Sequence, residues 1–129
     1  MAGQIEIALR TMTAAFDRKD FKAVVRAFTV DAQGIDEISR KWIRGRAGID
    51  AYMQQIDATI SGVKTLLRDI DERAWGDVGV VTCWLEQDYV VSGRAHHVSS
   101  PTTVIMRKQG GNWKIALFHS IPLGEKPGG

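Results

Sequence analysis

The order of patterns along the chain is the sequence feature that most restricts its fold. Apolar residues recur at helical spacing through most of the first 60 residues, and from residue 63 onward the chain alternates between strands and glycine-bearing turns. Helices followed by a run of hairpin-connected strands predict an antiparallel sheet with helices on one face. We therefore expect an α+β protein in which three N-terminal helices cover a curved, mixed but mainly antiparallel sheet and enclose a pocket.

The boundaries of the predicted elements follow from capping and turn residues. The first helix is followed by Asp20, a good N-cap for a short second helix, and the third helix is expected to end at Ser61-Gly62. Short extended segments are predicted at 30–38 and 41–45. The four long strands that follow are predicted at 64–75, 78–91, 95–108 and 113–121.

Composition narrows the class of protein. The 129 residues amount to about one domain, and we treat 1–129 as a single unit. The 17 Lys and Arg against 15 Asp and Glu are spread along the chain without a basic stripe, so no nucleic-acid partner is expected. No apolar run approaches the length of a membrane span. Charged residues near the N-terminus argue against a signal peptide, and the single cysteine, Cys83, favours a cytoplasmic protein.

Three groups of residues, taken in order, resemble the NTF2-like superfamily and the SnoaL-like group within it. They are Ala14-Ala15-Phe16 with Asp20-Phe21, Phe28 and Asp31-Ala32; Gly45 to Tyr52; and Gly111 to Ile115 followed by His119. The resemblance spans nearly the whole chain. It implies a cone-shaped NTF2-like fold with a pocket between sheet and helices, and a homodimer formed through the outer face of the sheet. Relatives such as ketosteroid isomerase and polyketide cyclases imply acid–base chemistry without a cofactor.

The closing motif departs from the group's usual pattern. The serine that usually stands two residues after the histidine is replaced by Ile121, because Ser120 follows His119 directly. The preceding strand lacks the group's arginine. The isomerase's first-helix tyrosine corresponds to Met12, and the strand that would carry its second acid offers residues such as Thr103. Ketosteroid isomerase activity itself is therefore not expected.

Asp36 is the first candidate catalytic residue. The segment from Asp31 to Asp36 resembles a ketosteroid isomerase segment whose second aspartate is the general base. A carboxylate on a pocket-lining strand is partly desolvated, which raises its pKa toward a value useful for moving protons. The alternative is that Asp36, beside Glu37, faces solvent at a strand end.

His119 is the second candidate. Uninterrupted alternation along the last strand would put His119 on the same, more apolar face as Trp113 and Ile115, and so inside the cone. It would then act as acid–base partner or hydrogen-bond to the ligand. A core histidine bonded to a neighbour is an equal alternative.

Other polar and aromatic residues give weaker signals. Trp42, Tyr52, Trp84 and Thr103 are candidates for the substrate-binding wall. The paired carboxylates Glu86 and Asp88 are expected to be solvated, and adjacent His96 and His97 face opposite sides of a strand. A metal site built from His96, His119 and Asp36 lacks any ligand motif, so neither metal nor cofactor is expected.

We interpret the chain as a SnoaL-like protein that binds a small, largely apolar molecule. Isomerisation, cyclisation, dehydration or hydrolysis would use Asp36 as base and His119 as partner. The alternative is a non-catalytic module that dimerises or binds a ligand or peptide. In the 78–91 strand both faces are apolar, with Val80 and Trp84 opposite Val81 and Leu85, which predicts a second cover for the sheet.

Overall fold

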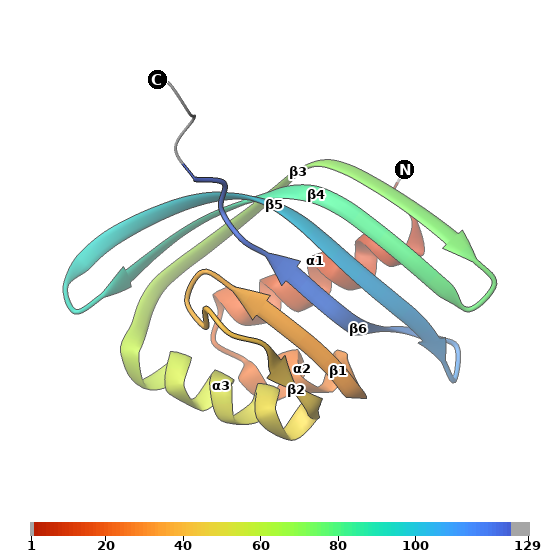
Figure 1. Cartoon of the computed structure of the whole chain (residues 1–129), viewed down its shortest axis with the longest axis horizontal. Coiled ribbons are helices and arrows are strands. Elements are labelled where there is room, and N and C mark those ends of the chain that lie inside the picture. The colour runs from red at the N-terminus through yellow and green to blue at the C-terminus, as the bar shows by residue number, and fades with distance from the viewer. Residues whose placement is uncertain (1, 125–129) are drawn as a thin grey trace.

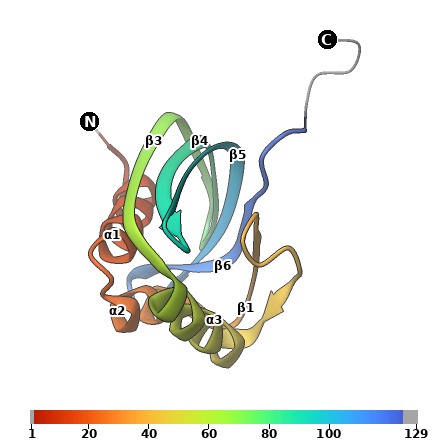
Figure 2. The ribbon, with the colours of Figure 1, turned by 90° about the vertical axis from the view of Figure 1, so that its left-hand side faces the viewer.

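The computed structural model describes residues 2–124 and has helices over one side of a strongly curved sheet (Figure 1). The helices are α1 (Gln4–Asp17), α2 (Phe21–Arg26) and α3 (Gly45–Thr59). The strands are β1 (Phe28–Asp36), β2 (Ile43–Arg44), β3 (Ile60–Trp75), β4 (Val78–Val91), β5 (Arg94–Gln109) and β6 (Asn112–Ser120). Seen from the side, α1 lies against β3 while α3 runs below the sheet (Figure 2).

The six strands form one sheet in the order β2-β1-β6-β5-β4-β3. Neighbouring strands are antiparallel except β1 and β6, which are parallel. The predicted α+β class with a curved, mixed sheet is therefore confirmed. The end of the third helix is corrected, because β3 begins at Ile60 rather than after Ser61-Gly62. Gly62 instead adopts a φ of 61° inside β3, where the pairing with β4 shifts register.

A bulge in β6 reverses the alternation of its side chains. Met106 pairs with Ile115, but the next residue toward the start of β5, Ile105, pairs with Leu117, so β6 contains one extra residue there. Ile115 and Ser120 are consequently both buried, at 1% exposure each, although they are separated by an odd number of positions. An extra residue moves every following side chain to the opposite face.

Hydrogen bonds fasten the helices to the sheet. At the end of α1, Asp17 accepts bonds from the Thr65 backbone N–H (2.8 Å) and hydroxyl (2.6 Å) on β3. Arg46 of α3 donates to the Phe28 carbonyl of β1 at 2.6 Å. The predicted cap of α2 is present, since Asp20 accepts a bond from the backbone N–H of Ala23 at 3.3 Å.

The core lies between the helices and the concave face of the sheet. From β4 it takes Val81, Cys83 and Leu85, all at most 5% exposed. Burial raises the pKa of the Cys83 thiol to about 11, so it stays protonated and packs as a small apolar group. Among residues 2–124, no helix combines the length and hydropathy needed to cross a membrane.

Two residues of α1 test where the helix buries its apolar face. Leu9 is fully buried and Ile7 is 53% exposed. We expect Leu9→Ala to lower the free energy of unfolding by about 2–5 kcal/mol, because it leaves a cavity in the core. The matched Ile7→Ala change should cost no more than about 0.5 kcal/mol. Urea denaturation of both variants at equal protein concentration measures the difference, and equal losses would contradict this helix orientation.

Candidate functional site

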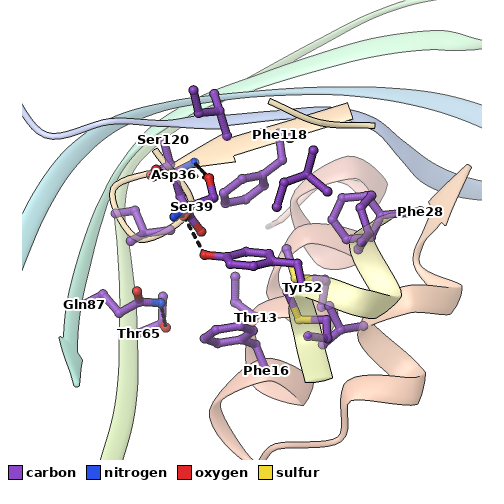
Figure 3. Close-up of a pocket in the computed structure, with 18 of the residues that line it drawn as sticks. Thr13, Phe16, Phe28, Asp36, Ser39, Tyr52, Thr65, Gln87, Phe118 and Ser120 are labelled. Carbon is purple, nitrogen blue, oxygen red and sulfur yellow. Dashed lines mark hydrogen bonds between the residues drawn. The ribbon is translucent and has the colours of Figure 1, made fainter. Parts of the chain in front are cut away.

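A cavity of about 80 Å³ lies between α1, α3 and the concave face of the sheet. Aromatic and aliphatic side chains form much of its wall, with Phe16, Phe28, Tyr52 and Phe118 as the aromatic members. Its polar members include Asp36, Glu37, Ser39, Thr65, Gln87 and Ser120. In Figure 3 the Tyr52 hydroxyl points toward Asp36, while Phe28 lies on the opposite side of the pocket. The cavity therefore has a polar end and an apolar end, as small-molecule sites commonly do.

The hydrogen bond between Tyr52 and Asp36 organises the polar end. Tyr52, on α3, donates to Asp36 Oδ1 at 2.7 Å (Figure 3). Burial, followed by the negative charge of Asp36, raises the pKa of the Tyr52 hydroxyl far above its ordinary value. The Tyr52 hydroxyl therefore stays protonated and donates this hydrogen bond, which connects α3 to the end of β1.

A turn directly after β1 orients Asp36. The same oxygen, Oδ1, also accepts bonds from the backbone N–H groups of Ile38 (3.0 Å) and Ser39 (2.8 Å). In return, the Asp36 backbone N–H donates to the Ser39 hydroxyl at 3.1 Å. An aspartate that binds the backbone two and three residues ahead is a common turn former. Three donors thus converge on one carboxylate oxygen.

Glu37 is the second carboxyl group of the pocket and has a different environment. Its Oε1 atom is buried and accepts no hydrogen bond from the residues that the structure describes. Burial, assisted by the neighbouring charge of Asp36 and opposed by a backbone hydrogen bond, raises the pKa of Glu37 from 4.5 to about 7. Glu37 therefore exchanges a proton near neutral pH, which is the property that a general acid or base requires.

A second hollow of about 490 Å³ adjoins the cavity between the turn after β1 and the end of α3. It shares Ser39, Ile43 and Tyr52 with the inner cavity. The two spaces therefore lie next to each other along these three side chains. The inner cavity alone is smaller than the ~300–1,000 Å³ of typical ligand pockets, so a larger ligand would extend into this hollow.

The sequence of the chain matches the model of one protein family. The model of the SnoaL-like domain matches residues 5–123, nearly the whole sequence. The chain belongs to the SnoaL-like domain family. The comparison with curated proteins gave no match.

Solved structures share the fold of this SnoaL-like chain at low sequence identity. A ketosteroid isomerase-like protein from Erwinia carotovora atroseptica is 18% identical, with a TM-score of 0.80 and 95% of each chain covered. A protein of the NTF2-like family from Streptomyces avermitilis, described as a candidate dehydratase, is 17% identical, with a TM-score of 0.87 over 95% of this chain and 96% of the other. An NTF2-like protein with a cystatin-like fold from Novosphingobium aromaticivorans is 18% identical, with a TM-score of 0.77 over 96% and 82%. These likenesses show the fold.

Two of the sequence-predicted site residues of the SnoaL-like chain, Asp36 and Tyr52, line one cavity and are hydrogen-bonded to each other. The prediction that His119 points into the cone is wrong. His119 is exposed on the outer face, 6.0 Å from the Trp42 ring between centroids. The reason is the β6 bulge, which turns Phe118 and Ser120 inward instead. Asp36 and His119 therefore do not share the pocket.

The remaining substrate-binding candidates lie outside the inner cavity. Trp42 is 40% exposed in the loop before β2. Trp84 faces outward on β4, with the Arg68 guanidinium 5.2 Å from the centre of its ring. Thr103 pairs with His119 across β5 and β6 and shares its outer face. None of these three residues is part of the lining of the inner cavity, to which Asp36 and Tyr52 belong.

The other polar candidates are divided between the two faces of the sheet. His97, outside, has Nδ1 2.7 Å from Asp88 Oδ1 and Nε2 3.7 Å from Glu86 Oε2. Hydrogen bonds from Ser99 and Arg68 lower the pKa of Glu86. His96 stacks on the buried Tyr89 ring at 5.2 Å. Within residues 2–124, no three His, Cys, Asp or Glu side chains gather closely enough to hold a metal ion.

Sequence reasoning missed the role of Glu37 at this site. Adjacent residues of a strand face opposite sides, so Asp36 in the pocket would imply Glu37 outside it. The strand ends at Asp36, however, and the turn brings both carboxyl groups into the lining. The Asp-x-x-Ser spacing of Asp36 and Ser39 was the available signal for such a turn. Phe118 and Ser120 were missed because of the bulge.

The titration of Glu37 predicts a pH dependence of stability. Between its ordinary pKa of 4.5 and its folded value of about 7, the folded state binds more protons at Glu37 than the unfolded state does. The contribution of Glu37 to the free energy of unfolding therefore falls as pH rises through this window. Glu37→Gln removes the effect, so the stability of the variant relative to wild type should increase from pH 5 to pH 8.

Urea denaturation across this pH range measures the difference. Asp57→Asn is the control, because that carboxylate is 62% exposed on α3. Its stability relative to wild type should change little over the same range. A difference between Glu37→Gln and wild type that is flat with pH would show that Glu37 titrates normally.

Proposed function

We propose that this chain binds a small, largely apolar molecule in the inner cavity and transfers a proton on it without a cofactor. The reaction class is isomerisation, cyclisation, dehydration or hydrolysis. The observation that carries the proposal is the pair of adjacent carboxyl groups, Asp36 and Glu37, at the polar end of an otherwise mainly apolar pocket. Membership of the SnoaL-like family and the NTF2-like fold are consistent with it.

The environment of the carboxyl pair supports acid–base chemistry. Asp36 is held in one orientation by Tyr52 and the backbone of the following turn. Glu37 has a pKa of about 7, so both of its protonation states are populated at neutral pH. Apolar walls exclude water and strengthen the electrostatic effect of each group on a bound molecule. His119 has no part in this proposal because it lies on the outer face.

The competing hypothesis from another class is a non-catalytic binding module. It predicts that the same cavity takes up a ligand whose affinity depends on its apolar walls and whose chemistry is unchanged by the protein. The two hypotheses differ in one measurable property, which is whether the carboxyl pair accelerates a proton transfer.

A neutral, apolar carbon acid provides the test. Nitrobenzisoxazole undergoes a one-step, base-promoted ring opening to a coloured cyanophenolate, so its consumption reports any positioned base in an apolar cavity. We expect the wild-type protein to accelerate this reaction and the double variant Asp36→Asn/Glu37→Gln to lower kcat/KM by about 10²-fold or more, the usual contribution of a general base.

The matched control uses two carboxylates of the outer face. Glu86→Gln/Asp88→Asn removes the same charge from the other side of β4 and should leave the rate unchanged. Thermal unfolding of each variant checks that it is folded. Equal rates for wild type and the inner-pair variant would overturn the catalytic proposal and favour the binding module.

We further propose that the chain forms a homodimer through the outer face of its sheet. Apolar side chains there are incompletely covered, with Leu66 61% exposed and Val80, Trp84 and Ile105 half-buried. Exposed apolar surface of this kind commonly marks an interface. Sedimentation at micromolar concentration should give a dimer for wild type and a monomer for Ile105→Glu. The α1 variant Ile7→Glu is the control and should stay dimeric, whereas a monomeric wild type would contradict the proposal.

A further inference from the structure

We propose that Glu37, rather than Asp36, is the group that takes up and returns the proton, and that Asp36 is held by its own hydrogen bonds as the neighbouring charge. We also infer the substrate class, which is a neutral or cationic molecule with a proton on an apolar carbon or a hydroxyl that faces the Glu37 carboxyl group. This inference rests on the proposed function and assigns its two carboxyl groups different tasks.

The carboxyl groups of Asp36 and Glu37 differ in their hydrogen bonds. Asp36 Oδ1 already accepts from Tyr52 and from the backbone N–H groups of Ile38 and Ser39, at 2.7 to 3.0 Å. A substrate proton arriving there would have to displace one of these donors and loosen the turn. Glu37 Oε1 is buried, belongs to a residue of the pocket lining, and has no partner among the described residues. A buried acceptor without a partner is costly unless a ligand or water supplies the donor.

The charges around Glu37 favour proton exchange at neutral pH. The titratable groups that influence it or respond to it are Asp36 on its own turn, Tyr52 from α3 and Tyr89 from β4. Burial and the two carboxylates raise the pKa of both tyrosines, so these hydroxyls stay neutral. The described lining contains no lysine, arginine or histidine. A negative charge that binds in the inner cavity next to Asp36 would be repelled, so the inner cavity favours a neutral or cationic group. The lysine of this region, Lys41, lines the adjoining hollow.

The proposed step is a proton transfer from the substrate to Glu37. In its ionised form, Glu37 removes a proton from the substrate carbon, the C–H bond breaks, and its electron pair remains on the substrate. In an isomerisation that pair forms a new double bond, and the protonated Glu37 returns the proton to another atom of the substrate. In a dehydration or other elimination the pair expels a leaving group, which takes the proton from Glu37. With nitrobenzisoxazole as probe, the C–H pair forms the nitrile, the N–O bond breaks, and its electron pair stays on the oxygen of the cyanophenolate product. The protonated Glu37 then releases its proton to solvent.

The experiment measures kcat/KM for nitrobenzisoxazole against pH in the wild-type protein and in three single variants. We expect the wild-type rate to rise with pH through a midpoint near 7, the pKa of Glu37. Glu37→Gln should lower the plateau by about 10²-fold or more, and Glu37→Asp should restore part of it. Asp36→Asn should retain most of the plateau but move the midpoint to lower pH, because it removes the like charge that raises the pKa of Glu37.

Carbon-13 NMR titration of the Glu37 carboxyl provides a readout that does not depend on turnover. It should give the same midpoint as the rate and the same downward shift in Asp36→Asn. His96→Asn is the control for the imidazole that stacks on Tyr89, and it should leave both midpoints in place.

The outcomes distinguish the inference from the proposed function. Loss of the rate in Asp36→Asn with an unaffected Glu37→Gln would overturn the inference and leave the proposed function standing, with Asp36 as base. A wild-type rate equal to that of both single variants would overturn both. A Glu37 carboxyl that titrates at its ordinary value, with an unshifted midpoint in Asp36→Asn, would also overturn the inference.

Discussion

The position of β6 between two partners of opposite direction governs the geometry of the pocket. On one side β6 is parallel to β1, and on the other it is antiparallel to β5. The pairing with β5 requires one extra residue in β6, and the pairing with β1 shifts register within β1, between Phe28 and Gln33. The bulge in β6 turns Phe118 and Ser120 toward the cavity. Because Asp36 pairs with Ser120, the same register also brings the end of β1 to the rim of the pocket. The site depends on this constraint more than on any single side chain.

The end of β1 at Asp36 places two neighbouring carboxyl groups, Asp36 and Glu37, in the same pocket but in different environments. Where the strand stops, two consecutive carboxyl groups face the same space, which regular strand alternation would forbid. Tyr52 and the turn hold one of them by hydrogen bonds, while one oxygen of the other, Glu37 Oε1, is buried without a partner among the described residues. Two identical functional groups thus occupy environments that differ in hydrogen bonding and desolvation. Such differences are how proteins give similar acids separate chemical roles.

The departures from the family's closing motif have a structural counterpart. In this chain His119 and Ser120 are adjacent and lie on opposite faces of the sheet, so they cannot act together on one ligand. His119 instead lies beside Trp42 on the outer surface. Family membership establishes the fold here, and the polar groups of the pocket have to be identified in this chain itself.

The sequence by itself determined the order of helices and strands, the hairpin turns, the α+β class and the candidacy of Asp36. Those properties depend on local periodicity, on turn residues and on a motif that lies within one segment. The placement of His119, Phe118 and Glu37 was decided only by the tertiary structure. A one-residue bulge and the exact end of a strand depend on pairing with distant partners, and they leave no trace in the local alternation of polar and apolar residues. Since side chains of a strand alternate with a period of two, one extra residue in β6 was enough to turn His119 to the outer face and Phe118 into the pocket.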